Sequence, residues 1–554
     1  MRRLDQIRAA TCHGSFASSV GPSRGNTNRV YHRTSARLLD DVCQSLSSET
    51  ASDYIDDQTK LFDWISVTTA TASRTVVSIR TIRIVVLIVS VLVVFFFQFR
   101  PLQNGLLEDW QFAQVWKTSG WNGFWASLPG TIGRPFHLIT PFLGLALSNG
   151  GFVGMFAVLG IIAVGQFLVV LWAFPPTSRY EPLVWAAGLG VALHPWWAAG
   201  DILRYMPAQF SCLAFCFFVA LTLRYMRGHR LRDLIVASLA GLIGLLAYQA
   251  LAITYLAFAL LVLLLLPRRS TQQSVSVFLA ALLPVVITFI YSVFLAPLLV
   301  PNSYEASLGD GAQGIWATLK AIAKTLLRQS PMAELSLVVL AGTTVVIAAL
   351  RIISVRNALF IVLLIVSSPL SAGAYAANAL QLNDPERLSF PIGTTAWLAM
   401  IAWPLVAGGG RVTSKVLIAA ILTVLITVGA SINLVQWAQY SSTQSKILRL
   451  IQPAVERADP TDKVLVADSS GTLGDVYTFL PPHLWFASEV ENDKATEVDL
   501  CTVDGTVKDQ PVAERFPIET TAACSVVDTG GAREMVSSTR IDGKPVDVYI
   551  VRSH

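Results

Sequence analysis

Eleven predominantly apolar segments run through this sequence, each suited to a helix that crosses a lipid bilayer. A hydrocarbon core about 30 Å thick needs roughly 20 apolar residues per helix, fewer where neighbouring helices shield the ends. The segments are residues 82–99, 150–174, 183–199, 207–225, 234–247, 249–266, 274–298, 333–351, 357–376, 389–407 and 416–434. They predict an α-helical polytopic membrane protein.

The composition agrees with this fold class. Of the 554 residues, 53% are hydrophobic and only 14% are charged, and the mean hydropathy is +0.56. A soluble protein carries about 25% charged residues. The formal net charge of +5 comes mainly from arginines that flank the apolar segments, so we expect the lipid bilayer, and no nucleic acid, as a partner.

Two segments need interpretation. The apolar run from Leu234 to Leu266 would extend about 50 Å as one straight helix, which exceeds the bilayer, so we divide it at "AYQA", Ala247 to Ala250. The stretch from Pro135 to Ser148 is too short to span and contains His137 and Pro141. We expect it to form a re-entrant or interfacial helix.

The distribution of charge supports the division and predicts the orientation. With the N-terminus in the cytoplasm, the short inner loops hold eleven basic residues and only two acidic ones, as the positive-inside tendency requires. The basic residues are Arg179, Arg224, Arg227, Arg230, Arg232, Arg268, Arg269, Arg351, Arg356, Arg411 and Lys415. The protein is therefore expected in the cytoplasmic membrane with its C-terminal region outside.

Three domains are predicted. Residues 1–80 are polar and lack an apolar period, which is typical of a disordered cytoplasmic tail. Residues 81–435 form the transmembrane domain, with outer loops at 100–149 and 299–332. Residues 436–554 contain short Val-rich strands such as "DKVLVADS" and "VDVYIVRS", and we expect a small extracytoplasmic α/β domain. Cys501 and Cys524 are a disulfide candidate if this region lies outside the cytoplasm.

The first outer loop contains "LLEDWQFAQVW" and then "TIGRPFH". A pair of carboxylates at the membrane face, Glu108 and Asp109, can accept a proton from a hydroxyl nucleophile or coordinate a hard divalent cation. The guanidinium of Arg134 can bind a phosphate through two hydrogen bonds. The alternative is an interfacial helix whose acidic side chains are merely solvated, and the residues alone favour neither interpretation.

Further candidates lie in the other outer loops. Asp201 and Arg204 are three residues apart, so they either contribute to a site or pair with each other on one helix face. Gln249 could bind a sugar hydroxyl or cap the hairpin backbone. Arg387, directly before a span, could reach a lipid phosphate or serve as a snorkelling anchor.

These motifs, in this order along the chain, resemble those of the GT-C superfamily of membrane glycosyltransferases. The similarity covers roughly residues 82–435 and rests on the acidic pair, "GRPF", "HPWW" followed by Asp201 and Arg204, "YQA" and "NDPERLSFP". It is strongest to the type-two O-antigen glucosyltransferase family and the protein O-mannosyltransferase-like group. In addition, "DSSGTLGDVYTFLPP" resembles a segment of uncharacterised actinobacterial membrane proteins.

The resemblance implies a hexosyl- or pentosyltransferase that moves a sugar from a polyprenyl-phosphate donor to a glycan or lipid acceptor of the cell envelope. It implies Asp109 with Glu108 as the catalytic base or as acids that hold Mg²⁺ or Mn²⁺, and Arg134, Arg204 and Arg387 as contacts to the lipid phosphate. Glu108 stands where the family more usually has a second aspartate. The alternative function, a transporter or flippase of lipid-linked saccharides, predicts charges at mid-bilayer, and the apolar segments contain almost none.

Overall fold

A computed structural model describes residues 81–100, 103–106, 108–176, 178, 181–196, 206–266, 270–301, 319–320, 322–323, 331–375, 385–408, 411–471, 479, 481–503, 522–524 and 532–552. The chain divides into two compact units, Met1–Ile84 and Val85–His554. The expected tail, residues 1–80, lies outside the described residues.

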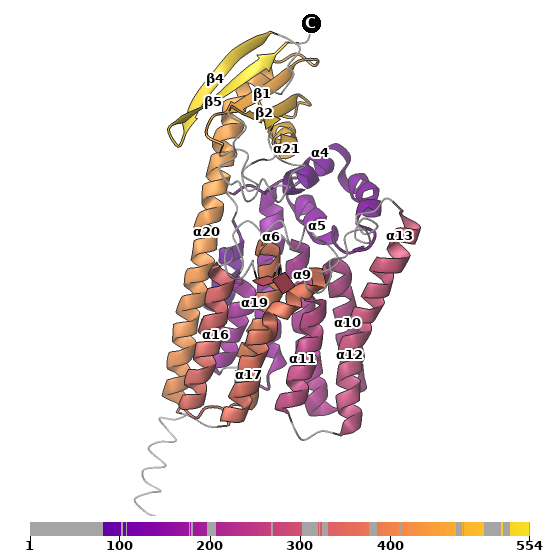
Figure 1. The fold of residues 1–554 in the computed structure, drawn as a ribbon, viewed down its shortest axis with the longest axis vertical. Helices are drawn as coiled ribbons and strands as arrows, with labels where there is room; N and C mark the ends of the chain where they lie inside the picture. Colours follow the sequence, from indigo (N-terminus) through magenta and orange to yellow (C-terminus); the bar gives the residue numbers. More distant parts are fainter. Residues whose placement is uncertain are drawn as a thin grey trace, which may run out of the picture. The chain divides into compact units, whose positions relative to one another are not determined.

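Each of the eleven predicted segments overlaps a helix, although the helix in segment 183–199 ends at Leu193 and residues 197–199 and 376 lie outside the described part of the chain (Figure 1). The chain is a multi-pass membrane protein. Seven helical stretches in the described part are long and apolar enough to cross a bilayer by length and composition. They are Thr81–Gln98, Phe152–Ala173 (α6), Met206–Gly228 (α9), Thr271–Leu299 (α12, η3 and α13), Val355–Tyr375 (α17 and η5), Arg387–Val406 (in α19, Pro385–Val406) and Val412–Arg457 (α20). The shorter helices of the bundle are Pro182–Leu193 (α7), Leu231–Ala247 (α10), Ala252–Leu265 (α11) and Pro331–Ala349 (α16).

The run from Leu234 to Leu266 is two helices, as the charge distribution predicts. The helix α10 ends at Ala247, and Tyr248 takes an extended conformation (φ −158°). A single 3₁₀ turn, η2 (Gln249–Leu251), then leads into α11. The segment after Pro135 forms the short helix α5 (Ile139–Leu147), which packs against α6.

The last membrane helix is much longer than predicted. The apolar segment 416–434 lies within α20, which continues for 46 residues to Arg457. Its second half is more polar in sequence, yet Trp437, Ile447 and Ile451 are fully buried against the C-terminal domain and the loop at residues 100–149. The boundary expected at residue 435 therefore falls inside one continuous helix.

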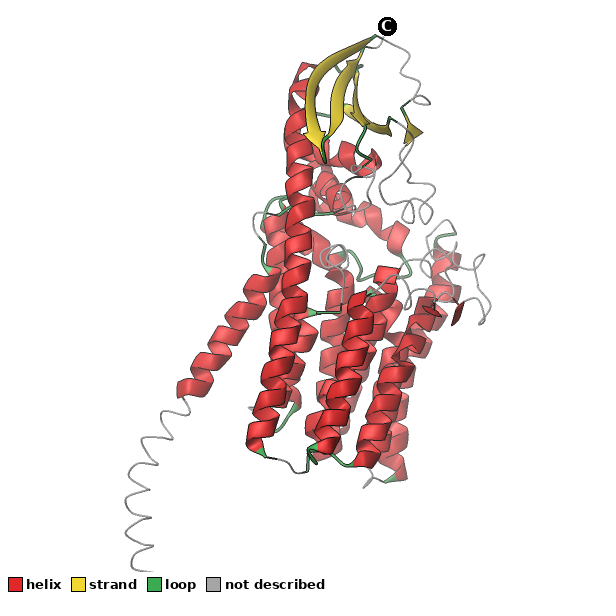
Figure 2. Cartoon of the chain, turned by 60° about the vertical axis from the view of Figure 1, so that its left-hand side comes forward, coloured by secondary structure: helices red, strands yellow, loops and turns green. Residues whose placement is uncertain are grey.

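The C-terminal residues form a five-stranded sheet with strand order β3-β2-β1-β5-β4 and the helix α21 (Pro481–Asn492). Figure 2 shows the strands in yellow beside the end of a long helix. The strands are β1 (Lys463–Asp468), β2 (Glu497–Thr502), β3 (Ala522–Ala523), β4 (Arg533–Ile541) and β5 (Lys544–Val551). β2 pairs in parallel with β1 on one side and with β3 on the other, whereas β5 runs antiparallel to both β1 and β4. Asp542 and Gly543 both have positive φ and form the tight β4–β5 turn, which such residues favour.

The α/β domain packs on α4 (Glu108–Ser127), in the loop at residues 100–149. The Lys117 ammonium of α4 lies 2.7 Å from the Asp493 carboxylate at the end of α21. Trp110 of α4 and Phe479 lie in one buried apolar cluster that also includes β1 and β2 residues. The α/β domain also contacts α20, where the Ser537 hydroxyl of β4 donates to the Leu450 carbonyl (2.8 Å).

Candidate functional site

The acidic pair lies at the start of α4, and its two members have different surroundings. The Leu106 N–H donates to Asp109 Oδ2 (2.9 Å), and the Asp109 N–H donates back to the Leu106 carbonyl (3.0 Å). Asp109 is 1% exposed, and a Cβ added to Gly105 would lie 2.6 Å from the Asp109 Cβ. One Asp109 oxygen therefore accepts a hydrogen bond within the turn that precedes the helix, whereas Glu108 is only partly buried.

The loop that carries Arg134 is held by hydrogen bonds from two other segments. The Gly133 carbonyl accepts from Gln249 Nε2 (3.1 Å) and from the Ser292 hydroxyl (2.9 Å). The Tyr291 hydroxyl donates to the Ile132 carbonyl (2.8 Å). Tyr291 and Ser292 begin η3 (Tyr291–Leu295), a π-helical turn, and such turns are frequent at functional sites.

The same contacts show what Gln249 does here. Its amide nitrogen donates both to the Gly133 carbonyl and to the Ser292 hydroxyl (2.5 Å), so one amide hydrogen ties the hairpin to the loop and the other ties it to η3. Any contact to a sugar must therefore come through the amide oxygen.

His137 lies at the centre of the site, although in the sequence it is only an interruption of an apolar segment. Its Nδ1 is 3.3 Å from the Ala247 carbonyl, an acceptor, so the neutral ring carries its proton on Nδ1. The ring stacks on Tyr248 with 6.4 Å between centroids. Tyr248 in turn hydrogen-bonds to Tyr375 (2.7 Å between hydroxyls) and contacts Phe390 of α19, 6.2 Å between ring centroids.

Charged groups from three predicted motifs act on His137. Its pKa is lowered to about 3, chiefly by burial and also by the charges of Arg134 and Arg387, while the Ala247 carbonyl and the charge of Glu108 oppose the change. Glu108, Arg134 and Arg387, which come from three separate motifs, therefore all lie close enough to His137 for their charges to act on its imidazole. Asp201 and Arg204 lie outside the described residues.

Tyr248, Tyr375 and His137 were not among the predicted site residues. A histidine in an apolar segment two positions after "RP" is the signal that could have indicated His137. Tyr375 carries no such signal, because its role depends on η5 (Ser368–Tyr375) folding against the hairpin at η2. In the described part of the chain, no three His, Cys, Asp or Glu side chains are grouped to hold a metal ion.

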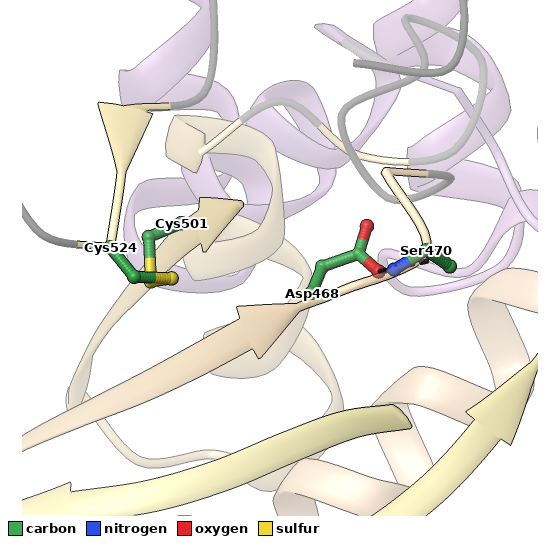
Figure 3. The surroundings of a disulfide bond; sticks show 4 residues. All are labelled: Asp468, Ser470, Cys501 and Cys524. Atoms are coloured by element: carbon green, nitrogen blue, oxygen red, sulfur yellow. Dashed lines mark hydrogen bonds between the residues drawn. A yellow bond between two sulfur atoms is a disulfide. The ribbon is translucent and has the colours of Figure 1, made fainter. Parts of the chain in front are cut away.

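A second set of polar residues lies at the carboxyl end of β1 and β2 (Figure 3). Cys501 of β2 is bonded to Cys524, which follows β3, with 4.8 Å between their Cα atoms. Asp468, the last residue of β1, accepts through Oδ1 from the backbone N–H (2.8 Å) and the hydroxyl (2.6 Å) of Ser470. The disulfide links β2 to the residue that follows the edge strand β3, and the Asp468 carboxylate holds the turn after β1 through its hydrogen bonds to Ser470.

The fold and the site define a class: a multi-pass α-helical membrane protein with arginines and a carboxylate gathered where its helices end, and with an α/β domain joined to the last helix. No family model matches the chain, and no curated protein matches it.

Two solved structures are similar, both of ArnT from Cupriavidus metallidurans. The structure bound to undecaprenyl phosphate gives a TM-score of 0.48 at 12% identity, with 85% of this chain and 98% of that chain covered. The apo structure gives a TM-score of 0.33 at the same identity and coverage. A likeness at this level assigns no activity.

Proposed function

We propose that this protein is a membrane glycosyltransferase that moves a sugar from a polyprenyl-phosphate donor to a glycan or lipid acceptor at the outer face of the membrane. The observation that carries the proposal is the convergence of Arg134, Arg387 and Glu108 around His137. A polyprenyl phosphate keeps its tail in the bilayer and its phosphate at headgroup depth. An enzyme that uses it needs cations for the phosphate and an acid for the acceptor hydroxyl at that same depth.

In the proposed reaction, the acceptor hydroxyl oxygen forms a bond to the anomeric carbon of the sugar. The bond from that carbon to the phosphate oxygen breaks, and its electron pair leaves on the phosphate. Arg134 and Arg387 stabilise the charge that develops there. A carboxylate takes the hydroxyl proton.

Of the two carboxylates, Glu108 is the better candidate for the base. Its charge acts on His137 together with both arginines, whereas one Asp109 oxygen accepts the Leu106 N–H. Asp109 remains the alternative base, and the same pair would hold a divalent cation if the reaction uses one. Asp201, Arg204 and Gln249 remain proposed contacts to the substrate.

The orientation is also a proposal, and it rests on the arginines of the short loops. These residues predict an inner N-terminus and an outer α/β domain. A disulfide such as Cys501–Cys524 is typical of an oxidising compartment. An alkaline phosphatase fused after residue 554 should be active in cells, and an inactive fusion would reverse the orientation.

The activity is tested with purified protein in nanodiscs, a panel of polyprenyl-phosphate sugars and detection of the released polyprenyl phosphate. We expect Arg134→Ala and Arg387→Ala each to reduce turnover about 100-fold or more, as loss of one group that stabilises developing charge does in other enzymes. Arg356→Ala is the matched control, since Arg356 lies over Phe360 in α17 and should leave turnover unchanged. Movement of the lipid-linked sugar across the bilayer without release of lipid phosphate would instead show a flippase.

The base is tested with a pair of isosteric variants. Glu108→Gln should abolish transfer, whereas Asp109→Asn retains a side-chain oxygen that can accept the Leu106 N–H and should keep more activity. The opposite ranking would assign the base to Asp109.

A further inference from the structure

Arg100 is a buried cation for which the described part of the protein supplies no counter-ion. It follows the first helix, is 4% exposed, and forms no ion pair with any described carboxylate. Its Nε donates to the Phe97 carbonyl (3.2 Å), and its guanidinium lies over the Trp437 ring, 5.5 Å from the centroid. Its Nη1 is buried without a hydrogen-bond partner among the described residues.

Such a group is costly. Burial lowers the pKa of Arg100 to about 10, so the side chain stays protonated at neutral pH. A buried charge without a partner is strongly unfavourable, and native proteins pair it with an opposite charge or a ligand. Among the described residues this side chain has no anion, and an anionic ligand would supply one.

The residues around Arg100 are connected in a ring, partly by contacts and partly by their positions along the chain. Trp437 lies one helical turn from Asn433 on α20, and Asn433 lies one turn from Gly429. A Cβ on Gly429 would lie 2.9 Å from Pro195 Cβ, just after α7. Three residues before Pro195, the Ala192 carbonyl accepts from Gln98 Nε2 (3.3 Å), and Gln98 is two residues from Arg100.

Other buried polar atoms on this ring also lack partners in the described part of the chain. They are Asn433 Nδ2, Gln98 Oε1 and the indole Nε1 of Trp196. Two of these three atoms are donors, as is Arg100 Nη1, and donors suit the oxygens of an anion. In native proteins few buried polar atoms lack a partner, so several on one ring call for an explanation.

An apolar cavity adjoins the ring. It has a volume of about 110 Å³ and is lined by Pro195, Trp196 and Gly429 of the ring together with apolar residues of α16, α19 and α20. Its lining includes Leu335, Val339, Met400, Leu425 and Ile432. A ligand here would meet cationic and polar groups on one side and hydrocarbon on the other.

We propose that Arg100, Asn433 and Trp196 bind the phosphate group of an anionic membrane phospholipid, part of whose acyl chain occupies the cavity between α16, α19 and α20. We treat this as a second site, because Arg100 contacts Phe97 and Trp437, whereas His137 contacts Ala247 and Tyr248. The proposal does not depend on the glycosyltransferase function, since it needs only a membrane protein and its lipids.

The test uses the full chain in nanodiscs of phosphatidylcholine, with or without phosphatidic acid, and measures thermal unfolding and lipid retained in native mass spectrometry. A ligand that binds only the folded state raises the unfolding temperature. We expect phosphatidic acid to stabilise the wild type and Arg100→Met to lose this effect, with affinity at least about tenfold weaker, as for loss of a charge-assisted hydrogen bond. In phosphatidylcholine alone, Arg100→Met should be as stable as wild type or more stable, because an uncompensated buried charge has been removed.

Arg356→Met is the matched control, because Arg356 also lies over an aromatic ring, at 5.7 Å from the Phe360 centroid, but is exposed. It should keep the full response to phosphatidic acid. If Arg100→Met does not fold, Arg100→Lys should retain part of the response and Asn433→Leu should weaken it. Stabilisation by inorganic phosphate but not by phosphatidic acid would overturn the lipid assignment, and an unchanged response in Arg100→Met and Asn433→Leu would overturn the site.

Discussion

At the scale of single residues, Tyr248 connects the parts of the candidate site. Its ring stacks on His137 and contacts Phe390, and its hydroxyl is hydrogen-bonded to that of Tyr375 inside the protein. Both tyrosines are about 6% exposed, so neither hydroxyl has water as an easy substitute. The hydrogen bond fixes η5 against the hairpin and thereby sets the place of the imidazole.

A double-mutant cycle measures this contact. Tyr248→Phe and Tyr375→Phe should each destabilise the protein by about 0.5–1.5 kcal/mol, because each removes the hydrogen bond between two buried hydroxyls. The double variant should be less destabilised than the sum, since it removes both hydroxyls. Unfolding in detergent with circular dichroism measures all four proteins, and strictly additive effects would contradict the coupling.

His137 predicts a pH dependence of stability. Its pKa is about 3 in the folded protein and about 6.5 in an unfolded chain, so between these values the unfolded chain binds more protons. Stability should therefore fall as the pH decreases from about 6.5 toward about 3. His137→Gln should lose less thermal stability than wild type between about pH 7 and pH 5, whereas the exposed His229→Gln should behave as wild type.

At the scale of elements, the crossing of α5 and α6 is made possible by two glycines. A Cβ on Gly154 would lie 2.0 Å from the Gly144 carbonyl oxygen, and a Cβ on Gly144 would lie 2.5 Å from Met155 Cα. The obstacles are backbone atoms, which cannot rotate away as a side chain can. The two helices are therefore as close as their backbones allow, and this approach positions the loop that carries Arg134 and His137.

Substitution of one glycine tests the crossing. Gly154→Ala should cost about 1–3 kcal/mol of stability, because the added methyl group forces the helices apart. Gly342→Ala in α16 is the control, since a Cβ added there would meet no described atom within 4 Å and alanine favours the helix by up to about 1 kcal/mol. Equal stability of the two variants would argue against the close crossing.

The helices were predictable from sequence, and their ends were less so. Apolar length and charge distribution identified each membrane helix and the break at Tyr248, because both signals are local. The extension of α20 to Arg457 was missed, since "QYSSTQSK" has little apolar character and becomes a helix through packing of residues such as Trp437 against distant elements.

At the scale of the whole molecule, the candidate site could be predicted only in part. Glu108, Arg134 and Arg387 were indicated by their residue types at helix ends, which follows from the cost of charges near lipid. His137 and Tyr375 were not, because their proximity depends on how loop, hairpin and η5 pack. Likewise, the different surroundings of Glu108 and Asp109 depend on a backbone turn that the letters "ED" do not reveal.

The 46-residue continuity of α20 has a consequence for helical phase. A helix turns about 100° per residue, so one alanine inserted near Gln439 would rotate the α/β domain about the helix axis by that angle. Seven inserted alanines would bring the rotation back to within about 20° of the original angle but would move the domain about 10 Å along the axis. If α21 contacts α4 only at one azimuth, the single insertion disrupts the Lys117–Asp493 pair by torsion and the seven-residue insertion disrupts it by height. Cysteines placed at positions 117 and 493 would then show, by whether they form a disulfide in each insertion variant, whether the rotation angle or the height of the α/β domain determines its contact with α4.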